Sequence, residues 1–332
     1  MKRIPSMKLI YSSVIAAASA AAFAFPLAAN AQPAYPSKPV LLILPLGAGS
    51  ASDFIVRTLT DRLSTALKQQ VVVQNMPGAG GTIGAERAAK AAPDGYTLTA
   101  LNNSIMTVAP HVYGKVGFDP FKSFTPITML ATFPTVLVVH PSMPVKSVKE
   151  LIALAKARPG QILYSSGGVG SPQHIAMAMF TNLAGVDLVH VPHRTAPAAL
   201  IDVIAGHVQA LFTGLSAPLP HLKPGRLRAL AMAGSKRSAL VPDVPTMQEA
   251  GVPGYVFDQW LALLAPAGTP ADVVNRLNAE SVKILAVQNV RDMLTQQSLD
   301  PQGGPPEDVT KALSTDFPRM AKIIQQAGIK PE

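Results

Sequence analysis

Two short loops rich in glycine and serine combine the residue types that bind an anion. They cover residues 45–53 and 165–174, and each connects an apolar run to a segment of helical length. Glycine lets a ligand approach the backbone, and the free N–H groups at the start of a helix attract negative charge. An ordinary strand-to-helix connection is the alternative for each loop. The ligand-binding candidates in the two loops are Gly49, Ser50, Ser52, Ser165, Gly167, Gly170, Ser171 and His174.

Two further stretches place polar side chains after predicted strands. Residues 192–197 carry His193, Arg194 and Thr195. The Arg194 guanidinium suits a bidentate bond to a carboxylate, and the alternative is a solvated surface charge. A second group follows the strand predicted at 96–101 and is expected to line the floor of the same site: Asn102, Asn103 and Ser104.

A third glycine-rich stretch, residues 77–84, resembles a dinucleotide-binding loop but fails the pattern. Gly78 and Gly80 require a third glycine at position 83, which is Ile83. No Gly-Lys-Ser/Thr sequence follows, so a phosphate-binding loop is excluded as well. A tight turn that lets a helix pack closely and a contact with ligand both remain open for this stretch.

The sequence lacks several short motifs that are typical of enzymes and metal sites. The stretch 214–218 lacks the second glycine of G-x-S-x-G, and no H-E-x-x-H sequence occurs. His190 and His193 are three residues apart but have no acidic ligand nearby in the sequence, which favours packing or ligand contact over a metal site. The chain has no cysteine. The sequence therefore predicts no catalytic residue, no metal and no cofactor.

Apolar runs alternate with helix-length segments along the chain. In a first block, strands are expected at 40–44, 71–74 and 96–101, with helices at 53–67 and 82–91. The pattern restarts with strands at 136–139, 162–164, 186–191, 208–212 and 227–232 and helices at 147–157, 172–183 and 198–205, and residues 270–329 are mostly helical. Ser52 or Asp53 is the expected N-cap of the first helix, Ser147 with Glu150 forms a capping box, and Ser171 caps the helix that starts at Pro172. The βαβαβ order predicts parallel, doubly wound sheets.

Two blocks predict two lobes. Residues 127–139 and 255–264 lie at the block boundaries and are interpreted as strands that pass between the lobes. Lobe one then consists of residues 32–131 plus 256–332, and lobe two of residues 132–255. Ligands of open α/β sheets bind beyond the carboxyl ends of the strands, so the site is expected in the cleft between the lobes.

The first 31 residues have the layout of a secretory signal peptide, with a basic start, an apolar stretch and an Ala-Asn-Ala cleavage pattern ending at Ala31. A membrane anchor is the alternative, and the proline at position 26 disfavours it. We therefore predict cleavage after Ala31 and a periplasmic location. With 48% hydrophobic and 14% charged residues the chain is not disordered. The net charge of +9 is dispersed and aromatic residues make up 5%, which disfavours nucleic-acid binding.

The chain resembles the periplasmic solute-binding proteins of tripartite tricarboxylate transporters, the Bordetella uptake gene family. The resemblance implies an α/β fold of the periplasmic-binding-protein type (type II), with two lobes, crossing strands as the hinge and closure like a flytrap. It also implies carboxylate recognition by loops 49–53 and 165–174. The matching residues span nearly the whole mature chain in order: YPSKP at 35–39, residues 45–57, Asn75, PGAGGTIGAE at 77–86, AAPDGYTL at 91–98, residues 147–151, Gly170, Ser171, His174, residues 190–192, 220–223 and 227–231, VPDVPT at 241–246, LAPAGTP at 264–270 and residues 327–330.

Departures from the family pattern bear on the ligand. The family usually has an aromatic residue where this chain has Leu46, Pro-Tyr-Lys-Gly where it has residues 192–195, and Asp where it has Thr213. Loss of that Asp disfavours an amino-acid ligand, while Arg194 and Thr195 favour a second anionic group. The expectation is a monomeric protein that delivers a di- or tricarboxylate, aliphatic or aromatic, to membrane transporter subunits. A protein that docks on a membrane sensor and an exported enzyme of the same fold are the alternatives.

Overall fold

The computed structural model describes residues 35–326 and 328. The predicted signal peptide and its cleavage site after Ala31 lie outside these residues. All the strands and helices described below lie within the unit formed by residues 38–332. Within the described residues, no helix combines the length and the apolar character needed to cross a membrane.

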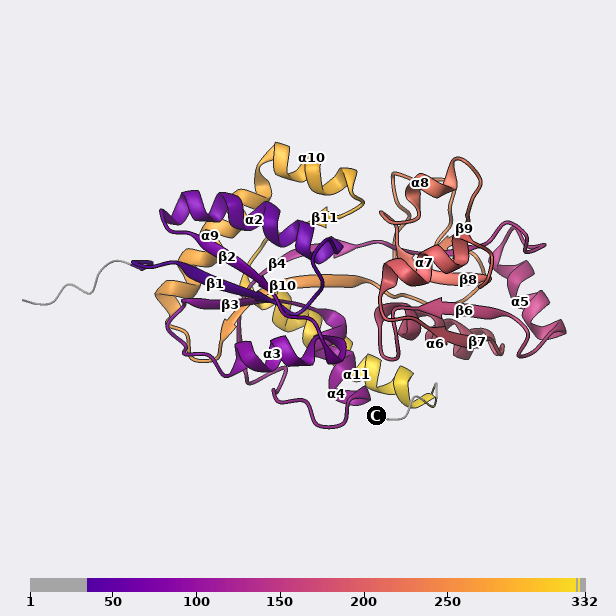
Figure 1. The fold of residues 1–332 in the computed structure, drawn as a ribbon, viewed down its shortest axis with the longest axis horizontal. Coiled ribbons are helices and arrows are strands. Elements are labelled where there is room, and N and C mark those ends of the chain that lie inside the picture. The colour runs from indigo at the N-terminus through magenta and orange to yellow at the C-terminus, as the bar shows by residue number, and fades with distance from the viewer. Residues whose placement is uncertain (1–34, 327, 329–332) are drawn as a thin grey trace, which may run out of the picture. The chain divides into compact units, whose positions relative to one another are not determined.

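The first sheet has the strand order β11-β4-β10-β3-β1-β2 (Figure 1). The strands β1 (Val40–Leu44), β2 (Val71–Asn75) and β3 (Thr97–Asn102) are parallel, as predicted. The chain then returns through β10 (Gln259–Pro266), which pairs antiparallel with both β3 and β4 (Phe124–Phe133). The short β11 (Asp300–Pro301) closes the edge. The complete sheet is therefore mixed, because strands from a later part of the chain extend the parallel core.

The second sheet has the order β7-β6-β8-β5-β9. It combines parallel β7 (Val189–Pro192), β6 (Leu163–Ser166) and β8 (Ala210–Gly214) with β5 (Thr135–Val139), which pairs antiparallel with β8 and β9 (Arg228–Met232). Two of these strands begin two or three residues later than predicted. In the case of β7 the reason is that its partner β6 begins only at Leu163, opposite Val189. The predicted fold class, two α/β sheets flanked by helices, is confirmed.

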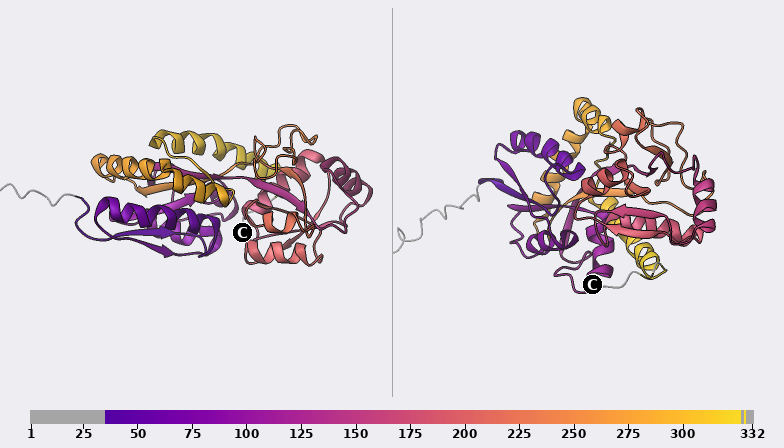
Figure 2. Two further views of the ribbon diagram at one scale, coloured as in Figure 1. Left: turned by 90° about the horizontal axis from the view of Figure 1, so that it is seen from above. Right: turned by 45° about the vertical axis from the view of Figure 1, so that its right-hand side comes forward.

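Helices lie on both faces of each sheet (Figures 1 and 2). In the second sheet, Leu137 and Val139 of β5 pack into the core beside α6, while Val136 and Val138 pack into the core beside α7. Side chains alternate between the faces of a strand, so an apolar run without polar interruption indicates a strand that is covered on both sides. The helices are α2 (Ala51–Leu67), α3 (Thr82–Ala89), α4 (Ala109–Val112), α5 (Val148–Ala157), α6 (Pro172–Ala184), α7 (Ala196–Ile204), α8 (Leu219–Leu222), α9 (Ala271–Ala286), α10 (Gln288–Gln296) and α11 (Pro306–Gln326), together with the 3-10 turn η1 (Ala79–Gly81) and the π-helical turn η2 (Ser104–Val108).

Helix caps follow the sequence signals with two differences. Ser171 caps α6 as predicted, whereas α2 is capped by Ser50 and not by Ser52 or Asp53, because the Ser50 hydroxyl accepts the Asp53 N–H at 3.2 Å. Ser147 caps α5 through the Glu150 N–H, but the Glu150 carboxylate accepts from the neighbouring Lys146 N–H. The predicted capping box is thus half formed, with the second bond displaced by one residue.

The connection between the two sheets is short on one side. Pro134 alone separates β4 of the first sheet from β5 of the second. The return strand is fixed beside this connection, because the Gln259 side chain donates to the Thr135 hydroxyl at 2.6 Å. The predicted crossing strands are therefore confirmed.

Helix α11 contributes to the cores of both sheets. Val309 and Leu313 pack with the core of the first sheet, while Met320 and Ile323 pack with the core of the second. Pro318 lies inside the helix between these two pairs. The lobe division predicted at residues 131/132 and 255/256 stays a prediction, with α11 shared between the lobes.

The indole of Trp260 and the carboxylate of Asp316 tie α11 to the first sheet. Trp260 Nε1 donates to Asp316 Oδ2 at 2.8 Å, and both residues are buried. Asp316→Ala leaves the indole N–H unpaired, so we expect a loss of about 1–3 kcal/mol in the free energy of unfolding. Urea unfolding followed by the fluorescence of the chain's single tryptophan measures it. The control is Asp61→Ala at an exposed position of α2, and an equal loss in both variants would contradict the prediction.

Candidate functional site

The first predicted loop is open on its outer side. A Cβ added to Gly47 or Gly49 would meet nothing within 4 Å, and Gly49 has φ +76°, a conformation that favours glycine. Ser50 follows at the N-cap of α2 with its hydroxyl on the Asp53 N–H. Because a hydroxyl that accepts one bond can still donate its own proton, Ser50 can serve both the helix and a ligand. Ser52 is buried in the first turn of the helix.

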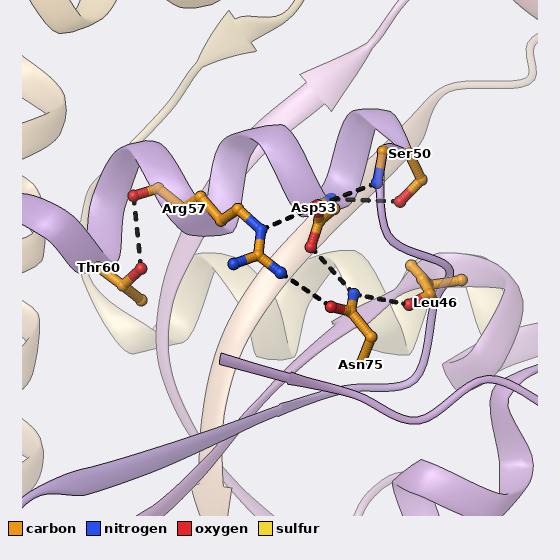
Figure 3. A network of polar contacts seen from close by, with 7 residues as sticks. Leu46, Ser50, Asp53, Arg57, Thr60 and Asn75 are labelled. Atoms are coloured by element: carbon orange, nitrogen blue, oxygen red, sulfur yellow. Dashed lines mark hydrogen bonds and ion pairs between the residues drawn. The ribbon is translucent and has the colours of Figure 1, made fainter. Parts of the chain in front are cut away.

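A buried carboxylate holds this loop in place (Figure 3). Asp53 Oδ2 accepts from the Gly49 N–H and from Arg57 Nε, each at 3.0 Å. Its other oxygen accepts from Asn75 Nδ2 at 2.9 Å, and the same amide nitrogen donates to the Leu46 carbonyl at 3.0 Å. Arg57 closes the network through a 2.9 Å bond to Asn75 Oδ1. The loop after β1 is therefore clamped between α2 and the end of β2.

The electrostatics of this network favour an ionised Asp53. Burial by itself raises the pKa of Asp53, but hydrogen bonds from Arg57, Asn75 and the Gly49 N–H, together with the Arg57 charge, lower it further than burial raises it. The net result is a pKa below the ordinary value of an aspartate. Asp53 is therefore negatively charged throughout the neutral pH range, and its charge is part of the hydrogen-bond network that holds the loop, which we call the Asp53 clamp.

The two adjacent serines at the start of the second predicted loop turn in opposite directions, because neighbouring residues of a strand face opposite sides. Ser165 is fully buried and its hydroxyl donates to the Ala199 carbonyl at 3.0 Å. Ser166, which the sequence analysis did not select, accepts the Gly168 N–H at 3.1 Å and contacts His190 Nε2 at 2.6 Å. Ser166 thus shapes the loop from within.

Three stacked rings, those of His174, His190 and Tyr164, support the second loop. The ring centroids of His174 and His190 lie 4.1 Å apart, and those of His190 and Tyr164 lie 4.8 Å apart, with nearly parallel ring planes. The Gly170 N–H donates to His174 Nδ1 at 3.1 Å, so the neutral ring carries its proton on Nε2. Burial and the neighbouring His190 lower the pKa of His174 to about 4, and burial followed by the His193 charge lowers the pKa of His190. The sequence marked His174 as a ligand candidate, and its position also supports the loop.

Asn102 at the end of β3 and the next two residues, which lead into η2, are buried. Asn102 Oδ1 accepts the Ile105 N–H at 3.0 Å, and Asn103 Nδ2 donates to the Asp258 carbonyl at 3.1 Å. Asn103 Oδ1 and Ser104 Oγ are buried polar atoms without a hydrogen bond in the described part of the chain. Such atoms carry an unpaid desolvation penalty, which a polar ligand group can relieve.

The fourth loop, residues 192–197, leads into α7, and Thr195 is the N-cap, its hydroxyl accepting the Ala198 N–H at 3.3 Å. Arg194 is exposed and has no hydrogen bond or ion pair to the other described residues. His193 Nε2 lies 3.2 Å from Asp202 Oδ2, and His207 Nδ1 lies 3.0 Å from the other oxygen. An acidic residue does therefore stand beside His193, contrary to the expectation from the sequence, because about two turns of α7 bring Asp202 back toward it. Among the described residues, no group of three or more His, Cys, Asp or Glu side chains is arranged so that it could hold a metal ion.

Thr213 lies on β8 opposite Val136 of the crossing strand β5. It is 4% exposed, and its hydroxyl makes no hydrogen bond to another described residue. Two cavities of about 460 and 470 Å³ lie elsewhere, around Pro141 and Arg228, and none of the predicted site residues lines them.

The predicted residues come together as two groups of loops. In the first group, a Cβ on Gly81 would approach the Pro45 carbonyl to 3.2 Å, so the third glycine-rich stretch packs on the first loop. In the second group, the His193 N–H donates to the Ser166 carbonyl at 2.9 Å, which joins loops two and four. The groups are connected by Tyr113, whose hydroxyl donates to the Val169 carbonyl at 3.0 Å. No sequence signal distinguishes Tyr113, since it belongs to none of the motifs.

The Asp53 clamp makes a prediction for acid stability. In the wild type, Asp53 stabilises the fold above the unfolded aspartate pKa of ~3.9, and this contribution is lost as the pH falls through the lower folded pKa. Asp53→Asn should cost about 1–3 kcal/mol at pH 7 and progressively less below pH ~4, as measured by urea unfolding. Asp272→Asn, in the exposed first turn of α9, is the matched control. A cost for Asp53→Asn that does not vary with pH contradicts the prediction.

The stack of His174, His190 and Tyr164 predicts a second dependence of stability on pH. Because the folded pKa of His174 is about 4 and the unfolded value ~6.5, the unfolded chain binds this proton first, and stability should fall as the pH drops through that interval. His174→Gln keeps an acceptor for the Gly170 N–H and should flatten the fall in melting temperature between pH 7 and 4. His221→Gln, in the short helix α8, should retain the wild-type curve. Parallel curves for His174→Gln and the wild type would rule the explanation out.

Comparison with known proteins identifies the family. Residues 55–329 match the family model for the tripartite tricarboxylate transporter family receptor, TctC. The curated protein BugT of Bordetella pertussis is 33% identical over 297 residues, covering 89% of this chain and 91% of BugT. A protein of Pseudomonas sp., described as a UPF0065 protein in the tcbD-tcbE intergenic region, is 35% identical over 88% of this chain and 87% of its own length.

Solved structures of similar proteins support the same family. An R. palustris protein solved with adipate is 34% identical, with a TM-score of 0.83 over 90% of this chain and 100% of the other. MatC from Rhodopseudomonas palustris, with bound malate, is 30% identical, with a TM-score of 0.79 over 87% of this chain and 100% of its own. The fold, the order of the motifs and these matches lead to one conclusion: the chain belongs to the tripartite tricarboxylate transporter receptor (TctC) family of periplasmic solute-binding proteins.

Proposed function

We propose that this chain is an extracytoplasmic solute-binding protein that captures a small carboxylate between its two groups of loops. The observation that carries the proposal is the position of the loops. The first and second loops leave the carboxyl ends of parallel strands β1 and β6 and enter α2 and α6 at capped N-termini. Helix N-termini supply N–H donors and positive dipole ends, which suit a carboxylate.

The capping hydroxyls are central to the proposed ligand contacts. Ser50, Ser171 and Thr195 each accept a helical N–H, and each keeps a proton to donate to a ligand oxygen. Ser52 stays in the proposed set, since at 7% exposure it is no more buried than Ser104 (6%) or Thr213 (4%). Ser165 is left out because its hydroxyl already donates to the Ala199 carbonyl. The other residues proposed for the site are Gly49, Asn102, Asn103, Ser104, Gly167, Gly170, His174, His193, Arg194 and Thr213.

We propose a dicarboxylate or tricarboxylate as the ligand class. Arg194 is exposed and lacks an acidic partner in the described part of the chain, so it is available for a second carboxylate. Thr213 supplies a neutral hydroxyl and no counter-charge for an amino group. Two family members were solved with dicarboxylates, adipate in one and malate in the other. This agreement supports the class, while the individual solute is for experiment to identify.

The remaining parts of the proposal concern transport. The chain is exported by a signal peptide cleaved after Ala31, acts in the periplasm as a monomer and delivers its solute to the membrane subunits of a tripartite tricarboxylate transporter. The two lobes, 32–131 with 256–332 and 132–255, close on the solute through their crossing strands. Ligand contacts to both lobes stabilise the closed arrangement by shifting its population. The protein performs no catalysis.

A melting screen followed by calorimetry tests the function. Aliphatic and aromatic mono-, di- and tricarboxylates and amino acids are added to the purified protein, and a true ligand at a hundred times its Kd should add about 2.7 kcal/mol of stability. Stabilisation by amino acids in preference to dicarboxylates would refute the ligand class. No stabilisation by any carboxylate would refute the function.

Arg194→Ala tests the second anionic contact. Loss of a charge-assisted pair should raise the Kd of the best dicarboxylate by more than about tenfold and leave a monocarboxylate nearly unaffected. The matched control is Arg226→Ala, another exposed arginine of the proposed second lobe, which should leave both affinities unchanged. Equal affinities in the Arg194 variant and the wild type would place Arg194 outside the site.

A further inference from the structure

The glycine-rich stretch at residues 78–81, which the proposed ligand site does not use, forms a seat for Tyr113. A Cβ added to Gly80 would lie 2.6 Å from Tyr113 Cε2 and 2.7 Å from its hydroxyl. Gly80 also has φ +62°, which side chains rarely adopt. Glycine is therefore favoured at this position for two independent reasons, and the tyrosine ring lies directly against the backbone of η1.

The seat is fixed to the first ligand loop. A Cβ on Gly81 would come within 2.5 Å of Ile105 Cδ1 and 3.2 Å of the Pro45 carbonyl, and one on Gly84 would come within 3.0 Å of the Pro45 ring. The turn therefore packs closely against Pro45, the residue at which the first loop begins. The position of Tyr113 is thus coupled to that loop through direct packing.

From this seat, Tyr113 reaches the second group of loops. Its hydroxyl donates to the Val169 carbonyl at 3.0 Å, and Val169 lies between Gly168 and Gly170, both with positive φ. The contact is tight beside the bond as well, since a Cβ on Gly170 would lie 3.0 Å from Val112 Cγ1. One side chain thereby connects the glycine-rich turn of the first group with the glycine-rich loop of the second.

We propose that Tyr113 is a latch that sets the distance between the two groups of loops and thereby the population of the closed arrangement. This inference rests on one part of the proposed function, the division into two lobes that close on each other, and not on the identity of the ligand. Val108 and Val112 also pack into the core of the second sheet, but apolar contacts are non-directional and permit sliding. A hydrogen bond has a preferred length and angle, so the Tyr113 hydroxyl fixes the register of the contact. Tyr113 is a positioning residue that acts through the loops.

Distance measurements between two spin labels test the latch. The chain has no cysteine, so Asp61→Cys on α2 and Ala153→Cys on α5 provide two exposed label sites, one in each proposed lobe. In Tyr113→Phe, the population of longer distances relative to shorter ones should rise about two- to tenfold, the factor that one neutral hydrogen bond represents. An unchanged distance distribution overturns the proposal.

The matched control is Tyr255→Phe. Tyr255 is fully buried, and its hydroxyl donates to the Ala176 carbonyl at 2.9 Å inside the proposed second lobe. This variant should lower the melting temperature and leave the label distances as they are. If it broadens the distribution as much as Tyr113→Phe does, the effect is one of general stability and the latch is refuted.

Measured affinities for solutes distinguish a failure of the latch from a failure of the proposed function. The label distances need no solute, so an absence of carboxylate binding would refute the proposed function and leave the latch standing. With the dicarboxylates that the wild type binds in calorimetry, Tyr113→Phe should raise every Kd by the same factor, because closure is common to all solutes. A change confined to one solute would place Tyr113 in the binding pocket and overturn the latch.

Discussion

The buried carboxylate of Asp53 is the interaction on which the first half of the site depends. A loop of small residues has little side-chain packing to hold it, so its position must come from hydrogen bonds to the backbone. Asp53 supplies one to the Gly49 N–H, and through Asn75 it also fixes the Leu46 carbonyl. The charge is balanced by the ion pair with Arg57 at 3.0 Å. The cost of burying this charge is thus offset within the scaffold.

The second half of the site is held by a different device. There the loop is supported by neutral rings, with His174 accepting the Gly170 N–H and stacking on His190. A charge would be poorly placed in this environment, and burial accordingly lowers the pKa of both histidines. One loop is therefore fixed by an ion pair and the other by uncharged rings. Acid weakens both, for opposite electrostatic reasons, since it removes a needed charge from Asp53 and forces an unwanted one onto His174.

Much of the fold was predictable because each local signal had one physical meaning. The apolar run 136–139 indicated a strand buried on both faces, and β5 contributes alternate residues to the two cores of its sheet. Ser171 followed by Pro172 indicated a helix start, and α6 begins there. The mixed character of the sheets was not predictable in the same way. The strand β10 inserts between β3 and β4 from more than a hundred residues away, and no local pattern records that pairing.

By itself, the sequence determined the class of fold, the crossing strands and the loops that leave the parallel strands, because these follow from periodicity, capping residues and ordered motifs. Only the tertiary structure decided which polar atoms those loops offer. A shift of one residue along β6 turns Ser165 into the core and Ser166 toward His190. The hydroxyl of Tyr113 finds Val169 56 residues further along the chain. Side-chain direction alternates at each strand position and long-range contacts depend on how elements pack, so neither can be read from the order of residues alone.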